Sequence, residues 1–314
     1  MKKKNIALLG GLASALAAIG TFATGVYVFC SVAFDKKPKV NLLVGDPVVE
    51  LEGMAKEGEE WLLAHDNHPV TMVNEEGMHL KAHYFPCEDA KRTIIEFHGW
   101  HSSWHRDFSA SSPFLHAMGC NLLIVEQRGQ GDSDGDHMTF GLEERLDVPQ
   151  WVHWYQEHIN CHIPIYLAGV SMGASTVLMA AAENYPPEVK GILADCGFTS
   201  AYEIIRTLGK QQFHIPQHPM MDGIRFLCKK KYGVDIRSWS TIDAMKASTL
   251  PVLLVHGNAD TFVPCAMSQE NYEACSNHKD LLIVEGATHA MSFVVDKDAY
   301  IKKVEQLFLH DNMG

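Results

Sequence analysis

The chain has 314 residues, of which 46% are hydrophobic and 20% charged, so it is long enough for one large α/β domain or two small ones. Its formal net charge of −12 leaves no basic surplus to neutralise phosphates, and we therefore expect no nucleic acid as a general partner. The eight cysteines are scattered and include no CxxC pair, so neither a zinc knuckle nor a disulfide framework is indicated, and we expect buried, reduced thiols.

Residues 1–35 are predicted to form an N-terminal membrane anchor. Three lysines at positions 2–4 precede a stretch from Asn5 to Phe34 that contains no charged residue. This stretch exceeds the ~20 residues that a helix needs to cross the hydrocarbon core, and it is too long for the apolar region of a typical signal peptide. We therefore expect an uncleaved, single-pass helix that holds the protein at the cell membrane.

The orientation of this helix is left open by the flanking charges. Three lysines precede the apolar stretch and three more follow it at positions 36, 37 and 39, so the positive-inside bias is nearly balanced. The short N-terminal flank favours an inside N-terminus with the folded domain outside the cytoplasm. The free cysteines favour the opposite orientation.

After the anchor, residues 36–66 are predicted to form a linker and then a helix, because apolar residues recur at helical spacing from Val48 to Leu63. Two alternating runs follow, Val70–Val73 and Met78–Phe85. They flank a polar turn that contains a glycine, which predicts a β-hairpin. The main domain is expected to cover residues 67–314.

Beyond the hairpin, apolar runs alternate with stretches of helical composition. Continuous apolar runs joined by helices are typical of parallel strands that are buried on both faces. The predicted strands are 93–97, 122–125, 163–168, 191–194, 252–255 and 281–284, and the predicted helices are about 103–118, 142–158, 171–184, 264–275 and 297–309. With the hairpin as an antiparallel edge, they predict an α/β fold with a mostly parallel, eight-stranded, doubly wound sheet.

One interval, about 198–248, is too long for a bare crossover between two strands. It contains aromatic, basic and proline-containing segments, and we expect it to form a small helical lid over the carboxyl edge of the sheet. An elaborated connection fits the same residues equally well.

A candidate nucleophile lies where residues 169–173 read Gly-Val-Ser-Met-Gly between a predicted strand and a predicted helix. A serine hydroxyl needs to be held exposed beside a base, and a sharp strand-to-helix turn does this. Ligands of open α/β sheets bind outside the carboxyl ends of the strands. Ser171, Asp260 and His289 each follow a predicted strand, so we expect them to meet there as nucleophile, acid and base. Asp195 also ends a strand and is the alternative acid.

These motifs together resemble the α/β-hydrolase superfamily over about residues 70–314. The order Ser, Asp, His is that family's order. Within it, the chain is similar to bacterial membrane-anchored hydrolases of the serine-aminopeptidase-like or Bem46-like type. The resemblance rests on the GVSMG turn, an early HG turn, an RGQGDSDG loop, an HGNAD turn, an ADCGFTS stretch and a late ATH.

The resemblance also implies an oxyanion hole formed by the backbone amides of Trp100 and Met172, each of which would lower the barrier by roughly 3 kcal/mol. His98 and Gly99 belong to the same turn as Trp100 and are expected to contact substrate, as is Phe198. Aromatic residues near the site suggest an apolar acyl pocket, and they are Trp100, Trp104, Phe198 and Phe213. No organic cofactor is implied.

Two other groups of residues were considered for roles at this edge. His98, His101 and His105 lie within eight positions, but the spacing offers no carboxylate partner, so we expect no metal site. Arg128 and Asp132 in the RGQGDSDG loop are expected to pair and hold that loop.

The sequence thus predicts a serine hydrolase that cleaves an ester, a thioester or a small amide through an acyl-enzyme. The expected partner is a small acyl substrate or a short peptide. The alternatives are aminopeptidase-like cleavage, acyl transfer, and a catalytically idle scaffold used for binding, and likeness of fold does not decide among them. The sequence does not indicate an oligomeric state.

Overall fold

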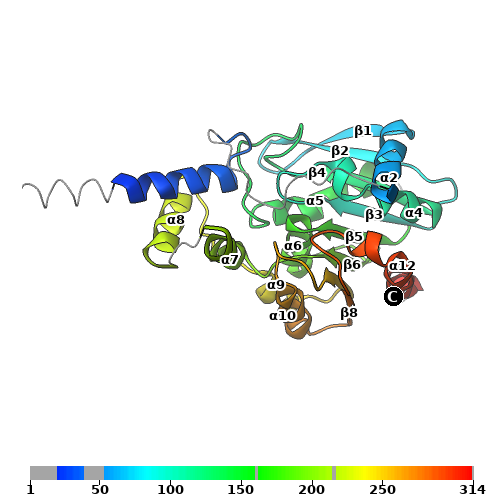
Figure 1. Cartoon of the computed structure of the whole chain (residues 1–314). Coiled ribbons are helices and arrows are strands. Elements are labelled where there is room, and N and C mark those ends of the chain that lie inside the picture. The colour runs from blue at the N-terminus through cyan, green and yellow to red at the C-terminus, as the bar shows by residue number, and fades with distance from the viewer. Residues whose placement is uncertain (1–19, 39–52, 160–161, 214–216, 313–314) are drawn as a thin grey trace, which may run out of the picture.

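A computed structural model of the chain describes residues 20–38, 53–159, 162–213 and 217–312 (Figure 1). Its centre is an eight-stranded sheet with the strand order β1-β2-β4-β3-β5-β6-β7-β8. The strands are β1 (His68–Val73), β2 (His79–Phe85), β3 (Arg92–Phe97), β4 (Cys120–Glu126), β5 (Ile165–Val170), β6 (Val189–Asp195), β7 (Val252–Gly257) and β8 (Lys279–Val284). The β1–β2 and β2–β4 pairs are antiparallel and the other five are parallel. The predicted sheet and its hairpin edge are therefore confirmed.

Helices cover both faces of this sheet. Helices α2, α4, α11 and α12 contribute to the apolar core on one face, and α5, α6 and α9 contribute to the core on the other, where α10 also packs on β7 and β8. The helices are α2 (Gly53–Ala64), α3 (Trp104–Asp107), α4 (Ser112–Ala117), α5 (Asp147–Ile159), α6 (Met172–Met179), α7 (Ala201–Phe213), α8 (Gln217–Lys231), α9 (Thr241–Ala247), α10 (Ala266–Ala274), α11 (Ser292–Val295) and α12 (Lys297–Phe308), with short 3₁₀ turns η1 (Glu144–Leu146), η2 (Ala180–Ala182) and η3 (Leu309–Asn312).

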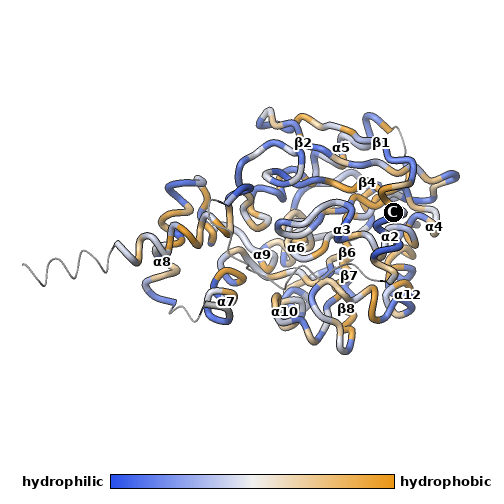
Figure 2. The backbone as a smooth tube through the Cα atoms, turned by 45° about the horizontal axis from the view of Figure 1, so that its top comes forward, coloured by the Kyte–Doolittle hydropathy of each residue, from blue (hydrophilic) through white to orange (hydrophobic). Residues whose placement is uncertain are grey.

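Strand β4 shows why the parallel strands have continuously apolar sequences. Leu123 and Val125 belong to the core beneath α5 and α6, whereas Leu122 and Ile124 belong to the core on the opposite face. Successive side chains of a strand point to opposite faces, so a strand covered on both sides needs an apolar residue at every position. Figure 2 shows this hydrophobic stretch around β4 and a second hydrophobic region around α8.

The described part of the predicted membrane anchor includes residues 20–34, which form a helix that we call the N-terminal helix. Four of its buried side chains, Val26, Cys30, Ala33 and Phe34, belong to one apolar cluster with residues of α7 and α8. Within the described ranges, no helix is both long enough and apolar enough to cross a membrane. Residues 1–19 of the predicted anchor lie outside the described residues, so the membrane anchor stays a prediction.

The interval 198–248 contains α7, α8 and α9. Helices α7 and α8 extend beyond the end of the sheet beside the N-terminal helix (Figure 1), and we refer to this pair as the lid. Helix α9 instead packs against α6 and α10 on the sheet domain. Residues 214–216 of the interval lie outside the described residues.

The loop after β4 is held by a buried ion pair that differs from the predicted one. The Arg128 guanidinium donates two hydrogen bonds to the Asp147 carboxylate, of 2.6 and 2.7 Å, and also lies 2.9 Å from Glu76. Asp132 is exposed, and its backbone amide donates to Glu126. The prediction of an Arg128–Asp132 pair was therefore wrong, because the arginine turns inward to the first residue of α5 instead of remaining within its own loop.

The Arg128–Asp147 pair leads to a prediction about stability that the local sequence does not give. Arg128→Met leaves the Asp147 carboxylate buried without its cation, which costs about 3–5 kcal/mol in the free energy of unfolding. Asp132→Asn, the control, changes an exposed side chain and should alter stability by less than about 0.5 kcal/mol. Chemical denaturation of both variants and the parent measures the difference, and equal midpoints for the two variants would contradict the assignment.

Glu96 predicts a pH dependence of stability. This residue of β3 is fully buried, and one carboxyl oxygen accepts a hydrogen bond from Ser112 while the other has no partner among the described residues. Burial raises the pKa of Glu96 to about 8, so the folded state holds its proton more tightly than the unfolded chain does. Stability from this group is complete below pH 4.5 and is lost as the pH rises through 8, by roughly 3–5 kcal/mol.

Glu96→Gln keeps the shape of the side chain and removes its titration. Near pH 5, the variant and the parent should have similar free energies of unfolding, as far as the amide replaces the protonated carboxyl. At pH 9, the variant should be clearly more stable than the parent. Denaturant titrations at the two pH values check this. A difference between parent and variant that is the same at both pH values would show that folding does not raise the pKa of Glu96.

Candidate active site

Ser171 lies at the tip of a sharp turn between β5 and α6. Its backbone has φ 56° and ψ −116°, a conformation that non-glycine residues adopt only under constraint. The glycines on either side are required by space: a Cβ at Gly173 would lie 1.8 Å from the Phe97 carbonyl oxygen, and one at Gly169 would lie 2.3 Å from Gly173. The Ser171 amide also donates to the Asp195 carbonyl at 2.8 Å. The turn thus holds the hydroxyl at the carboxyl edge of the sheet.

The structure brings Ser171, His289 and Asp260 into one hydrogen-bonded row. The Ser171 hydroxyl oxygen is 2.9 Å from Nε2 of His289, which lies in the loop after β8. The other ring nitrogen, Nδ1, is 2.7 Å from Oδ2 of Asp260, in the loop after β7. Because a carboxylate only accepts, we assign the ring proton to Nδ1, which leaves Nε2 to accept from the serine hydroxyl.

The environment of Asp260 keeps its carboxylate ionised. Its side chain is fully buried, which by itself raises the pKa. Hydrogen bonds from His256 and His289 lower the pKa by more than burial raises it, so the pKa of Asp260 lies well below its usual range. Oδ1 accepts from the backbone amides of Phe262 and Val263, both at 2.8 Å. The carboxylate is therefore charged and fixed in orientation beside the imidazole.

Asp195, the alternative acid, has a different environment. Its carboxyl group accepts a hydrogen bond from Ser292 at 3.1 Å, and it makes no hydrogen bond to His289 within the described part of the chain. Burial raises the pKa of Asp195 to about 6, in contrast to the lowered pKa of Asp260. The geometry thus favours Asp260 as the partner of the histidine.

The turn after β3 lies directly beside the serine. A Cβ at Gly99 would be 3.3 Å from the Ser171 Cβ, so the two backbones are in close contact. Asp107 holds this turn by accepting from the Gly99 amide at 2.5 Å and from the Ser102 hydroxyl. Among the described residues, the amides of Trp100 and Met172 donate to no other group. They remain available for a ligand oxygen next to Ser171.

The three residues expected to contact substrate have different positions. Phe198 lines a cavity that opens from Ser171. His98 is fully buried, with Nδ1 2.9 Å from the Gly99 carbonyl, and it does not line this cavity. The Gly99 amide is already bonded to Asp107. His98 and Gly99 therefore shape the turn and do not face the cavity, because the strand end directs the His98 side chain into the core.

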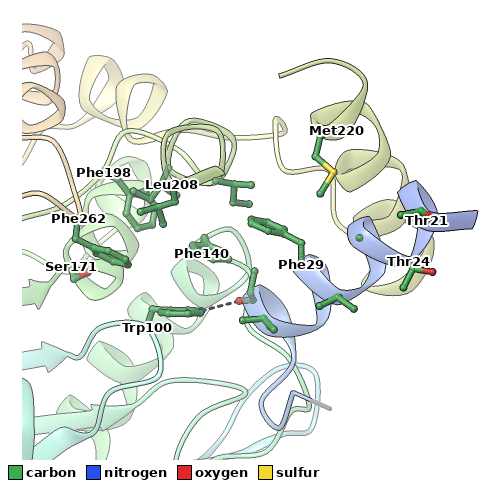
Figure 3. A pocket seen from close by; sticks show the side chains of 16 residues that line it. Thr21, Thr24, Phe29, Trp100, Phe140, Ser171, Phe198, Leu208, Met220 and Phe262 are labelled. Atoms are coloured by element: carbon green, nitrogen blue, oxygen red, sulfur yellow. Dashed lines mark hydrogen bonds between the residues drawn. The ribbon is translucent and has the colours of Figure 1, made fainter. Parts of the chain in front are cut away.

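The cavity has a volume of about 410 Å³ and is almost entirely apolar (Figure 3). Next to Ser171, four aromatic side chains from four different loops surround it: Trp100, Phe140, Phe198 and Phe262. Further out, its walls are formed by α7, α8 and the N-terminal helix. Trp104, also expected near the site, instead stacks on His83 at a centroid distance of 3.8 Å, and the side chain of Phe213 lies outside the described residues.

The described residues that could hold a metal do not form a suitable site. Cys196, Asp260 and His289 have potential ligand atoms within 4.8 Å of one another. However, burial raises the pKa of Cys196 well above its usual value, so it stays a neutral thiol, and the other two are bonded to each other. His101 and His105 contact Val32 and Glu59, in different directions from His98. The seven described cysteines form no disulfide.

Sequence reasoning missed several residues around the site. Asp107 supports the turn after β3, and His256 supports the Asp260 carboxylate. Nothing in the local sequence of either residue indicates this role. The N-terminal helix was interpreted only as an anchor, yet its cavity-lining residues recur at the three- and four-residue spacing of a single helix face. That spacing was the available signal.

The chain is similar in sequence to several known proteins. The chain is 28% identical over 238 residues to the YqkD protein of Bacillus subtilis, and the aligned region covers 76% of this chain and 77% of YqkD. It is 25% identical over 178 residues to the bem46 protein of Schizosaccharomyces pombe, and the aligned region covers 56% of this chain and 54% of that protein.

Solved structures show the same fold. The esterase Pf2001 of Pyrococcus furiosus superposes with a TM-score of 0.63 at 22% identity, over 86% of this chain and all of that one. Est1E of Butyrivibrio proteoclasticus, solved with ferulic acid bound, superposes with a TM-score of 0.59 at 20% identity, over 78% of this chain and all of that one. The family model described as X-Pro dipeptidyl-peptidase (S15 family) matches residues 60–219, just over half of the chain. The chain therefore belongs to this S15 family within the α/β-hydrolase superfamily and is Bem46-like.

Proposed function

We propose that the protein is a serine hydrolase that cleaves a carboxylic ester or thioester through an acyl-enzyme at Ser171. The observation that carries this proposal is the continuous row of hydrogen bonds from the Ser171 hydroxyl through His289 to the ionised Asp260 carboxylate. The esterase structures and the S15 family membership support a hydrolase in general. The specific nucleophile and substrate class are inferred from the site.

Each residue has a role that follows from its contacts. Ser171 Oγ attacks the carbonyl carbon while Nε2 of His289 takes the hydroxyl proton. Asp260 stabilises the imidazolium that forms, since its charge lies 2.7 Å from Nδ1. The amides of Trp100 and Met172 would donate to the oxyanion, and the Met172 amide is at the positive N-terminal end of α6. His289 then returns the proton to the leaving oxygen or sulfur, and water releases the acyl group by the same steps in reverse.

The apolar cavity argues against aminopeptidase-like cleavage. An aminopeptidase must bind a free α-ammonium group, which needs a carboxylate or a set of carbonyl acceptors close to the nucleophile. Among the described residues that line the cavity, none is charged. An apolar acyl group fits these walls, whereas a buried ammonium group would lack a partner. This comparison favours ester or thioester cleavage over the removal of N-terminal residues from peptides.

A fluorophosphonate probe tests the nucleophile. The parent protein should be labelled at Ser171 and should hydrolyse p-nitrophenyl butyrate. Ser171→Ala should lose labelling completely and lose at least roughly 10³-fold in kcat/KM, because the remaining groups cannot form the acyl-enzyme. Mass spectrometry of the labelled peptide identifies the site. Labelling that persists in Ser171→Ala would disprove the assignment of the nucleophile.

The two buried aspartates form a matched pair of variants. Asp260→Asn should lower kcat by about 10⁴-fold, because an amide facing Nδ1 favours the wrong imidazole tautomer and does not stabilise the imidazolium. Asp195→Asn changes a carboxyl group that contacts Ser292 and should keep kcat within about threefold of the parent. Steady-state kinetics with p-nitrophenyl butyrate compare them. A larger loss of kcat in Asp195→Asn than in Asp260→Asn would reverse the assignment of the acid.

A further inference from the structure

Resting on the proposed function, we propose that the substrate of Ser171 carries a long fatty acyl chain and that the N-terminal helix forms the wall along which this chain lies. The cavity that begins at Ser171 is bounded on one side by this helix and on the other by the lid (Figure 3). The helix is therefore part of the acyl-binding site.

The N-terminal helix is firmly attached to the domain at its C-terminal end. Phe34 is fully buried between the rings of Phe140 and Tyr232, at centroid distances of 5.2 and 5.1 Å. Its carbonyl accepts from the Met138 amide at 2.8 Å. The next residue, Asp35, accepts from Lys231 at the end of α8. These contacts fix the position of the helix relative to both the sheet domain and the lid.

The same end of the helix is bonded to the turn that carries the expected oxyanion donor. The indole Nε1 of Trp100 donates to the Ala33 carbonyl at 2.8 Å. Carbonyl groups in the last turn of a helix have no partner within the helix, so the Trp100 indole satisfies one of them. The helix therefore braces the Trp100 turn, and the cavity wall and the reaction centre form one unit.

One face of the helix lines the cavity over its whole described length. The lining residues run from Ala33, beside Trp100, through Phe29, Val28 and Gly25 to Thr21. The twelve steps from Ala33 to Thr21, at a rise of 1.5 Å each, span about 18 Å. A staggered hydrocarbon chain with C–C bonds of about 1.5 Å advances roughly 1.25 Å per carbon, so this wall matches about 14 carbon atoms.

The chemistry of the walls selects a hydrocarbon. The opposite wall consists of Ile204, Ile205 and Leu208 from α7 and Met220 from α8. On the helix, the polar side chains that line the cavity, Thr21 and Thr24, are both at the outer end, away from Ser171. A chain with polar groups along its length would lose hydration without gaining partners, whereas methylene groups gain free energy from burial.

The residues at the outer end of the cavity are exposed, and exposed apolar side chains lie on the same two helices. Gly25, Thr21 and Thr24 are exposed there, and nearby Phe22 packs toward Gly223 of the lid. Phe226, on the same lid helix, is 65% exposed. Exposed apolar side chains on these helices are suited to contact with a hydrocarbon chain, whether from a membrane lipid or from an acyl ester in solution.

A series of tryptophan variants tests the helix as a ruler for chain length. No described atom lies within 4 Å of a Cβ placed at Gly20 or Gly25, and only Gly25 lines the cavity. Val28 lies one turn closer to Ser171. Val28→Trp and Gly25→Trp should therefore block the cavity at two depths about 4.5 Å apart, or roughly four carbons. Gly20→Trp is the matched control on the same helix.

The readout is kcat/KM for p-nitrophenyl esters from C2 to C16, measured as monomers or at one fixed detergent concentration. For the parent, kcat/KM should rise by up to about fourfold for each added methylene and stop rising near C14. Gly25→Trp should lower the optimum, Val28→Trp should lower it further by about four carbons, and Gly20→Trp should not move it. Gly20→Trp, which does not line the cavity, should keep C2–C4 hydrolysis and fluorophosphonate labelling within about threefold of the parent. Gly25→Trp and Val28→Trp should lose more activity on long esters than on short ones.

The outcomes separate this inference from the proposed function. If Ser171 is labelled and short esters are cleaved but the optimum is the same in all variants, the acyl-chain inference is overturned and the hydrolase proposal stands. If the parent shows neither labelling nor turnover, the proposed function fails and the inference fails with it. If both cavity variants lose as much activity on short esters as on long ones, the inference that the helix sets the length of the acyl chain is also overturned.

Two further substrates identify the source of the chain. Vesicles of dimyristoyl phosphatidylglycerol present the acyl group in a bilayer, and myristoyl-coenzyme A presents it in solution as a thioester. Release of myristate from the vesicles assigns a membrane lipid, and release from the thioester assigns a soluble carrier. Release from neither overturns the assignment of a long-chain acyl substrate.

Discussion

The contact between Gly173 and the end of β3 is the constraint on which the rest of the site depends. Because a Cβ at this position would overlap the Phe97 carbonyl, only glycine allows α6 to begin directly against the neighbouring strand. That packing forces Ser171 into a backbone conformation with positive φ, and the surrounding core of α6, buried at every position, holds it there. The serine hydroxyl consequently faces the loops after β7 and β8 while the turn after β3 lies against its Cβ.

The charges of the site depend on two aspartates at the carboxyl ends of β6 and β7. Asp195 and Asp260 follow adjacent strands and are both buried, which raises the pKa of a carboxyl group in each case. They differ in their hydrogen bonds: Asp260 accepts from two imidazoles and two backbone amides, and these bonds outweigh the cost of burial. Two residues of the same type thus have opposite shifts of pKa within one site, and Asp260, whose pKa is lowered, is the one that is hydrogen-bonded to His289.

The N-terminal helix links the reaction centre to the outer surface of the molecule. Its last turn accepts a hydrogen bond from Trp100, its buried face packs on the lid, and a second face lines the cavity. A helix that is apolar on most sides must bury more than one face. Over residues 20–34, the lid and the cavity account for two of these faces, and the composition that predicts a membrane helix also suits a wall for an apolar ligand.

Local sequence determined the order of elements and the chemistry at the strand ends. Apolar runs identified all eight strands, and Ser171, Asp260 and His289 could each be placed after a strand, because period and turn residues are encoded within a few positions. The tertiary structure alone decided the partners that are distant in sequence. Arg128 pairs with Asp147 and not with Asp132, His98 faces the core, and Ala33 bonds to Trp100, 67 positions away. Such contacts depend on how helices and loops pack across the sheet, and no periodic pattern in a single sequence specifies them.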